Sequence, residues 1–138
     1  MARINQLLRS NNRGRDKVRK GLAGLVGCPQ KRGRCIKVYT MNPKKPNSAI
    51  RKVVKISLTK KVLGKEKEIY VTASVPGIGH SLQKNAVVMY RGGRANDLPG
   101  VRYRLIRGKL DFTEKESIER KKRRSFYGAN KPKKEDSE

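Results

Sequence analysis

Residues 34–58 read RCIKVYTMNPKKPNSAIRKVVKISL, and this stretch decides the fold. Its two ends, residues 34–41 and 53–58, alternate apolar with polar side chains, which is the period of a half-buried β-strand. Between them, Pro43 and Pro46 fix φ and lack an N–H, so neither suits a helix interior or a central strand. The stretch therefore predicts two strands joined by a stiff loop.

The loop from Pro43 to Lys52 combines positive charge with small polar side chains. Asn47 and Ser48 favour turns because their side chains hydrogen-bond to nearby backbone. Such a loop suits a phosphate-lined cleft, whereas taken alone it fits a solvated basic turn better, and only the rest of the chain favours the first interpretation. No carboxylate lies near enough in sequence to neutralise its cations, which are Lys44, Lys45, Arg51 and Lys52.

Three more stretches have the pattern of strands: residues 68–74, 86–91 and 101–107. Five short strands separated by loops are typical of a small all-β barrel or sandwich. A nucleic-acid partner favours the five-stranded OB-type barrel among these. We expect that barrel to occupy residues 34–108.

Both ends of the chain are basic, and we expect them to be extended. Residues 1–33 form the predicted N-terminal arm, with a short helix within residues 1–9, where apolar side chains have helical spacing. The rest of the arm has too few aliphatic side chains to fold alone, so it should become ordered on its partner. Residues 109–138 form the predicted C-terminal tail, with charges at helical spacing over residues 111–124. Without a partner this tail should be mobile.

The net charge indicates a polyanionic partner. The chain holds 36 Lys and Arg against 11 Asp and Glu, a formal charge of +25. Self-repulsion on this scale disfavours a compact isolated monomer. The longest apolar run, residues 86–90, is far shorter than the ~20 residues of a membrane-spanning helix. We therefore expect a nucleic acid and no membrane.

Three further loops each allow two interpretations. Residues 59–67 form a Lys-rich hairpin connection around Gly64, which is either solvated or bound. The glycines of residues 76–85 either let the backbone approach a phosphate closely or only form turns. Asp97 either orients Arg94 or a neighbouring lysine, or begins a turn.

The residue types present give little support to a catalytic, metal or redox site. Cys28 and Cys35 are the only cysteines and His80 is the only histidine, so a tetrahedral metal site would lack ligands. A disulfide is geometrically allowed, but two cysteines in so basic a chain favour unlinked thiols in a reducing compartment. The scattered carboxylates give no acid–base pair. We expect neither enzymatic activity nor a cofactor.

A free single-strand binder on the same kind of barrel is the main alternative function. Such proteins stack bases on clustered aromatic side chains. The chain has five Tyr and two Phe, and no predicted strand holds more than one of them. Binding through the phosphate backbone and RNA shape is therefore favoured.

A series of specific loop motifs runs along the chain. It includes Asn5-Gln6-Leu7, Cys28-Pro29-Gln30-Lys31-Arg32-Gly33, Pro43-Lys44-Lys45-Pro46-Asn47-Ser48-Ala49, Pro76-Gly77, Gly79-His80, Arg91-Gly92-Gly93-Arg94, Asp97-Leu98-Pro99-Gly100-Val101-Arg102-Tyr103, Arg107-Gly108 and Tyr127-Gly128. This series resembles the small-subunit ribosomal protein twelve family, in its bacterial and organellar branch, from Arg3 to about Lys134.

The resemblance implies an OB barrel beside the decoding site of the small ribosomal subunit, with the N-terminal arm threaded through rRNA. The implied partners are small-subunit rRNA, the mRNA–tRNA duplex in the A site and neighbouring small-subunit proteins. Pro46, Asn47 and Ser48 would face the codon–anticodon helix and help to monitor pairing. Asp97 matches an aspartate that many bacterial members carry as a β-methylthio derivative. The cations matched to rRNA binding are Lys31, Arg32, Lys44, Lys45, Arg51, Lys52, Arg91, Arg94, Arg102 and Arg107.

The chain also departs from the family pattern. Residues 84–85 and 95–96 differ from the usual residues, residues 59–67 form a longer segment than usual, and an acidic end follows Lys134. An Arg-rich start fits an organelle transit peptide. The family pattern begins by Arg3, however, so we expect no such peptide and translation where the protein works. The altered loops favour an organelle matrix over a bacterial cytoplasm, and a mitochondrion over a plastid.

Overall fold

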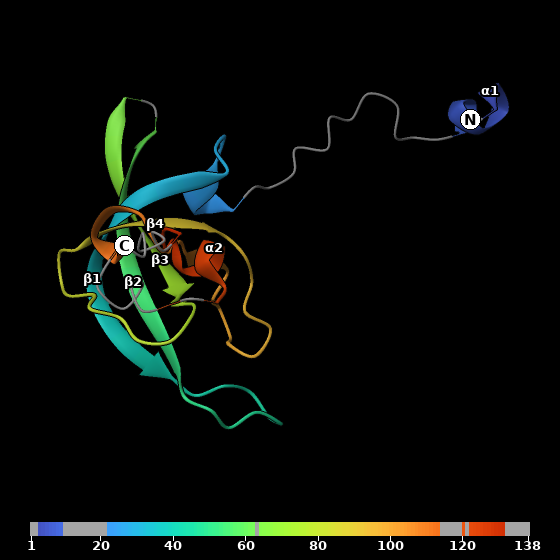
Figure 1. The fold of residues 1–138 in the computed structure, drawn as a ribbon. Coiled ribbons are helices and arrows are strands. Elements are labelled where there is room, and N and C mark those ends of the chain that lie inside the picture. The colour runs from blue at the N-terminus through green and yellow to red at the C-terminus, as the bar shows by residue number, and fades with distance from the viewer. Residues whose placement is uncertain (1–2, 10–21, 63, 114–119, 121, 132–138) are drawn as a thin grey trace, which may run out of the picture.

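The computed structural model describes residues 3–9, 22–62, 64–113, 120 and 122–131 (Figure 1). Five strands dominate it, with short helical turns before and after them. The elements are α1 (Ile4–Arg9), η1 (Ala23–Leu25), β1 (Gln30–Met41), β2 (Arg51–Val62), β3 (Lys65–Ser74), β4 (Val87–Gly92), β5 (Tyr103–Leu105), η2 (Leu110–Phe112) and α2 (Arg124–Tyr127). Helix α1 confirms the short helix predicted within residues 1–9.

The five strands close into a barrel in the order β1-β2-β3-β5-β4. Strands β3 and β5 run parallel, whereas the other neighbouring pairs are antiparallel. Strand β1 closes the barrel because residues 30–34 pair with β4 and residues 34–41 pair with β2. This topology confirms the predicted all-β, five-stranded barrel of OB type.

All five strands lie where the alternation predicted them, but their ends differ. Strands β2 and β3 continue to Val62 and Lys65, which pair with each other, so most of the predicted Lys-rich connection is a β-ladder. Gly64 has a φ of 76°, as expected of the turn residue. Strand β5 is short because the backbone of Val101 bonds to the preceding loop, where Ala95 N–H donates to its carbonyl.

Strand β1 contains a bulge at Ile36 that breaks the predicted alternation. Cys35 lies opposite Ile56 and Val38 lies opposite Val54, so residues three apart face the same side. One extra residue in a strand has this effect. Cys35 is consequently buried in the core, and burial raises the pKa of its thiol to about 11.

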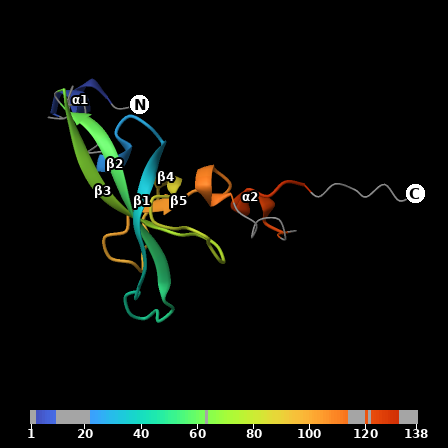
Figure 2. The same ribbon diagram turned by 90° about the vertical axis from the view of Figure 1, so that its left-hand side faces the viewer.

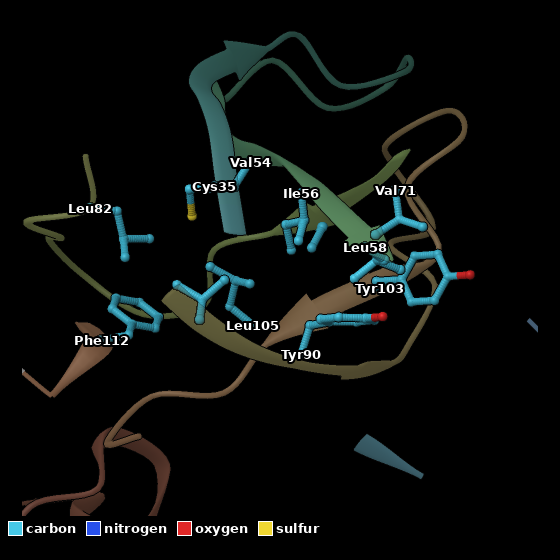
Figure 3. Close-up of a cluster of buried hydrophobic side chains, with 12 residues drawn as sticks. Cys35, Val54, Ile56, Leu58, Val71, Leu82, Tyr90, Tyr103, Leu105 and Phe112 are labelled. Atoms are coloured by element: carbon cyan, nitrogen blue, oxygen red, sulfur yellow. The ribbon is translucent and has the colours of Figure 1, made fainter. Parts of the chain in front are cut away.

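The main hydrophobic core runs through the barrel (Figure 3). At one end, Tyr90 and Tyr103 meet edge to face with ring centroids 5.5 Å apart. Tyr90 Oη donates to the Gly24 carbonyl at 2.7 Å, and Gly24 N–H donates to Tyr103 Oη at 3.0 Å. Burial raises the pKa of Tyr90, which keeps this hydroxyl protonated as a donor. The two tyrosines thereby fix η1 across this end of the barrel.

Residues 22–33 differ from the extended arm that the sequence predicted. Leu22 and Leu25 pack against the main core, and β1 begins at Gln30 instead of residue 34. Gly92 permits the contact, because a Cβ there would lie 3.0 Å from Leu22 Cδ1. Two leucines are enough to hold residues 22–25 in place, because they pack on an apolar surface that the barrel already provides. The prediction for residues 10–21 lies outside the described residues, and the three-part division of the chain stays a prediction.

The other end of the barrel is closed by residues after β5, which corrects the prediction of a wholly mobile tail. Phe112 of η2 is 2% exposed and joins Leu82 in the main core (Figure 3). Tyr127 of α2 is 6% exposed. Phe112 packs in the core of the barrel and Tyr127 packs against Gly77 and Arg107, which a sequence without helical or strand periodicity did not indicate. The charge pairs predicted over residues 111–124 lie largely outside the described residues.

Arg107 connects these segments and is only 6% exposed despite its charge. Its guanidinium stacks on the rings of Phe112 and Tyr127, at 4.5 and 5.1 Å from their centroids. Such stacking requires a planar cation, which arginine provides and a lysine ammonium does not. The guanidinium also donates to three carbonyls of the loop after β3, those of Pro76 at 2.6 Å, Ile78 at 3.3 Å and Gly79.

Two glycines let the backbone itself come close beside Arg107. A Cβ on Gly108 would lie 2.7 Å from Gly128 Cα, and one on Gly77 would lie 2.7 Å from Tyr127 Cε1. The φ angles of Gly108 and Gly77 are both 82°. Four of the sequence motifs therefore meet in one structural joint. They are the motifs at residues 76–77, 79–80, 107–108 and 127–128.

Arg107→Ala should lower the free energy of unfolding by about 3 kcal/mol, because buried carbonyls lose a charged donor and two rings lose their stacking partner. Arg107→Lys should restore only part of this loss. Thermal unfolding of the chain, at a salt concentration that screens its net charge, measures both effects, with Arg104→Ala as the matched control at an exposed arginine. Equal stabilities of the two alanine variants would contradict the structural role of Arg107.

Candidate nucleic-acid interface

The loop between β1 and β2, residues 42–50, projects from one end of the barrel (Figures 1 and 2). All side chains from Lys44 to Lys52 are exposed. Asn47 N–H donates to the Lys44 carbonyl at 3.0 Å, which closes a turn around Lys45 and the cis peptide bond before Pro46. The tip that the sequence predicted therefore stands clear of the barrel.

A second loop, residues 93–102, holds the base of the first loop through Asp97. Lys44 N–H donates to the Asp97 carbonyl at 2.8 Å. The Asp97 carboxylate accepts from Arg51 Nε at 3.1 Å, as an ion pair. Because Lys44 lies at the start of the exposed tip and Arg51 begins β2, one residue fastens both sides of the 42–50 loop.

Apolar packing fixes the position of the second loop. Ala95, Leu98 and Val101 form a separate buried cluster with Val53. Val53 alternates with the core residue Val54, so this cluster lies on the outer side of β2. An ion pair with side chains 45% and 22% exposed contributes only about 0.2–1 kcal/mol. Packing therefore supplies most of the stability here, and Asp97 sets how the two loops align.

The interpretations of Asp97 from sequence were each incomplete. Asp97 does lie in a turn, which Leu98 N–H closes by donating to the Ala95 carbonyl at 3.3 Å. Its charge partner is Arg51, 46 positions earlier, and not Arg94. A partner so distant along the chain has no local sequence signal.

A basic groove of about 760 Å³ runs from these loops across the outer face of the strands. Its floor is a row of cross-strand partners, in which Ser74 pairs with Arg104, Arg104 with Arg91, and Arg91 with Gln30. Like charges directly opposite each other in a sheet are destabilising. An anion bound between Arg91 and Arg104 would remove that repulsion.

The walls of the groove add flat apolar surface to this charge. Ile78 is 67% exposed and Phe126 is 46% exposed. An exposed aromatic ring beside arginines suits the face of an unstacked base. Sequence reasoning missed Arg104, Ile78 and Phe126 as functional candidates. The alternation of residues 101–107 did place Arg104 outward, whereas the exposure of Phe126 depends on the burial of its neighbour Tyr127.

Seven of the ten cations predicted to bind rRNA gather around the two loops and the groove. Lys31 and Arg32 lie on β1, where they pair with Tyr90 and Met89 of β4, and they do not line the groove. Arg107 also lines the groove, but it is buried against backbone carbonyls and rings, so its contacts stabilise the fold, and its binding to rRNA stays a prediction. The gathered cations are Lys44, Lys45, Arg51, Lys52, Arg91, Arg94 and Arg102.

The chemistry that this surface offers is that of binding. Among the described residues, no three or more His, Cys, Asp or Glu side chains are grouped so as to hold a metal ion. No helix in the described part of the chain is long and apolar enough to cross a membrane. Cations, short polar groups and flat apolar surfaces are the groups that contact RNA phosphates, 2′-hydroxyls and unstacked bases.

A family comparison agrees with this surface and with the loop motifs. The model of the family described as Ribosomal protein S12/S23 matches residues 18–134. The match spans the barrel, both loops, the groove and α2.

Asp97→Asn should loosen the 42–50 loop without unfolding the barrel. A weakened ion pair with Arg51 costs about 0.2–1 kcal/mol, so the Lys44 amide should exchange with solvent up to about fivefold faster. Hydrogen exchange measured by NMR tests this, and Arg51→Gln should act in the same way. The Ile106 amide, which donates to Met89 within the barrel, is the internal control. Unchanged Lys44 exchange in both variants would contradict the tie between the loops.

Proposed function

Because the chain belongs to the ribosomal protein S12/S23 family, we propose that it works at the decoding centre of the small ribosomal subunit, where its 42–50 loop monitors codon–anticodon pairing in the A site. The family consists of structural ribosomal proteins and not of enzymes. The chain is accordingly a structural component of the ribosome, which implies contacts with rRNA and with other ribosomal proteins.

The form of the 42–50 loop is the observation that carries the decoding proposal. A probe of RNA shape must reach out from its domain and still keep a fixed position. Here the tip residues are exposed, while the base is fastened on both sides by Asp97. A solvated turn without a partner would need no such fastening.

The tip carries groups suited to testing the shape of paired RNA. RNA minor grooves are shallow and display 2′-hydroxyls, so a short hydroxyl such as that of Ser48 can sense pair geometry without reading base identity. A mispair that leaves this hydroxyl buried and unpartnered would cost about 1–3 kcal/mol. That is roughly one to two decades in binding, a share of the discrimination and not all of it.

The cations have a different part in this proposal. Phosphate contacts position a protein on nucleic acid but carry no sequence information. We assign Lys44 and Lys45 to rRNA around the decoding site. Arg91 and Arg104 would hold phosphates of a further rRNA segment in the groove, with Phe126 available to an unstacked base. The tip then remains free for the messenger–tRNA duplex.

Ser48→Ala should change the miscoding frequency by up to about tenfold while subunit assembly stays normal, because the tip loses its hydroxyl but no packing. Lys44→Arg should also shift the miscoding frequency, since the planar arginine guanidinium does not make the same contacts as the compact lysine ammonium. A near-cognate decoding reporter measures both variants.

The matched controls for these variants are Ser81→Ala and Lys84→Arg, at exposed positions in the loop after β3. Both controls should leave miscoding unchanged. If Ser48→Ala and Lys44→Arg assemble normally and also leave miscoding unchanged, the decoding role assigned to the loop is wrong.

A further inference from the structure

The hairpin of β2 and β3 extends from the barrel at the end opposite the 42–50 loop (Figures 1 and 2). Its ladder pairs Thr59 with Glu68 and Lys60 with Lys67, and it continues to the turn at Gly64. This extension is not needed to close the barrel, and the decoding proposal gives it no function.

The two faces of the hairpin differ in charge. Side chains directly opposite each other in a ladder share a face, and the faces alternate along each strand. The face that is turned to the core at Leu58 and Ile69 continues outward with a lysine face, which we define as Lys60, Lys65 and Lys67. The register positions of the opposite face are Thr59, Lys61, Glu66 and Glu68, so both carboxylates of the hairpin belong to this face.

The acidic face already has partners within the protein. Glu68 Oε2 accepts from Tyr70 Oη at 2.8 Å. The Tyr70 ring in turn lies beneath the Lys55 ammonium, which is 5.2 Å from its centroid. In the register Glu66 lies opposite Lys61, so this face combines positions of both charges.

The lysine face has no such balance. Lys60 and Lys67 are direct cross-strand partners, and like charges in that position are destabilising. In the described part of the chain, none of the three lysines of this face forms an ion pair with a carboxylate. A two-stranded ribbon is only marginally stable by itself, so repulsion along one side of it favours a polyanion bound there.

We propose that the lysine face is a second RNA-binding surface, which holds the phosphate backbone of an rRNA segment remote from the 42–50 loop. The observations favour RNA over an acidic protein because the whole chain carries +25 and belongs to a ribosomal family. Lysine ammonium groups are point charges, so they hold the backbone without selecting a sequence. The inference uses the family of the chain but not its decoding role.

Salt-dependent rebinding of the full chain to small subunits depleted of it tests this proposal. The variant K60Q/K65Q/K67Q should bind more weakly, and its plot of log affinity against log salt should be shallower by about 2, since each phosphate contact contributes about 0.7–0.9 to the slope. K60R/K65R/K67R should keep the native slope, which controls for folding of the hairpin.

E66Q/E68Q is the matched control on the opposite face and should leave the slope unchanged. The control adds two units of positive charge and the lysine variant removes three, so a change of opposite sign and about two thirds of the size would mean that net charge alone matters and would overturn the proposal. An unchanged slope in K60Q/K65Q/K67Q would also overturn it. If that variant loses affinity for depleted subunits but not for protein-free small-subunit rRNA, the partner is a protein and the proposal is wrong.

The hairpin experiment is separable from the decoding experiment. Subunits assembled at low salt with K60Q/K65Q/K67Q should decode with normal accuracy, because the hairpin and the 42–50 loop lie at opposite ends of the barrel. Ser48→Ala should leave the salt slope unchanged. Each proposal can therefore fail while the other stands.

Discussion

The contacts of Asp97 with Lys44 and Arg51 are the constraint on which the functional surface depends. Without these contacts a long cationic loop would sample many positions. Within the loop, one backbone hydrogen bond closes the turn at Lys44–Asn47, and the side chains of the tip are exposed. The second loop is held in place by apolar packing on the outer side of β2, and Asp97 transmits that position to the first loop. A weak ion pair thus acts by fixing how the 42–50 loop is aligned with the 93–102 loop. Its own contribution to the free energy of folding is small.

Arginines serve opposite purposes in this chain, and burial separates them. Arg107 is enclosed by carbonyls and rings, so its charge stabilises the joint between the loop after β3 and the C-terminal residues. Arg91 and Arg104 face solvent side by side, where their charges repel and are available to an anion. The joint at Arg107 docks α2, and α2 in turn supplies Phe126 to the groove. The structural arginine therefore shapes the surface on which Arg91 and Arg104 lie.

Most of the barrel could be predicted from the sequence, because period-2 alternation and the prolines of the 42–50 loop are local signals. The exposed loop with small polar side chains at its tip followed from the same signals, since Pro46 and Ser48 lie between two well-marked strands, whereas the decoding role proposed for it came from the family resemblance. The parts that could not be predicted depend on distant contacts. Phe112 and Tyr127 are isolated aromatic residues in a charged segment, and their burial requires a barrel already formed. The bulge in β1 and the Arg51–Asp97 pair likewise arise from packing between strands and loops.

We thus assign three surfaces by position: a loop tip proposed to sense RNA shape at one end of the barrel, a basic groove beside it, and a lysine face proposed to bind rRNA at the other end. The most direct test of this account is a density map of the small subunit with tRNA in the A site. The account predicts Ser48 Oγ within hydrogen-bond distance of the minor groove of the codon–anticodon helix, with the Asp97–Arg51 pair intact behind it. Pro46 and Ser48 turned away from the messenger–tRNA duplex, or the barrel placed far from the decoding site, would contradict it.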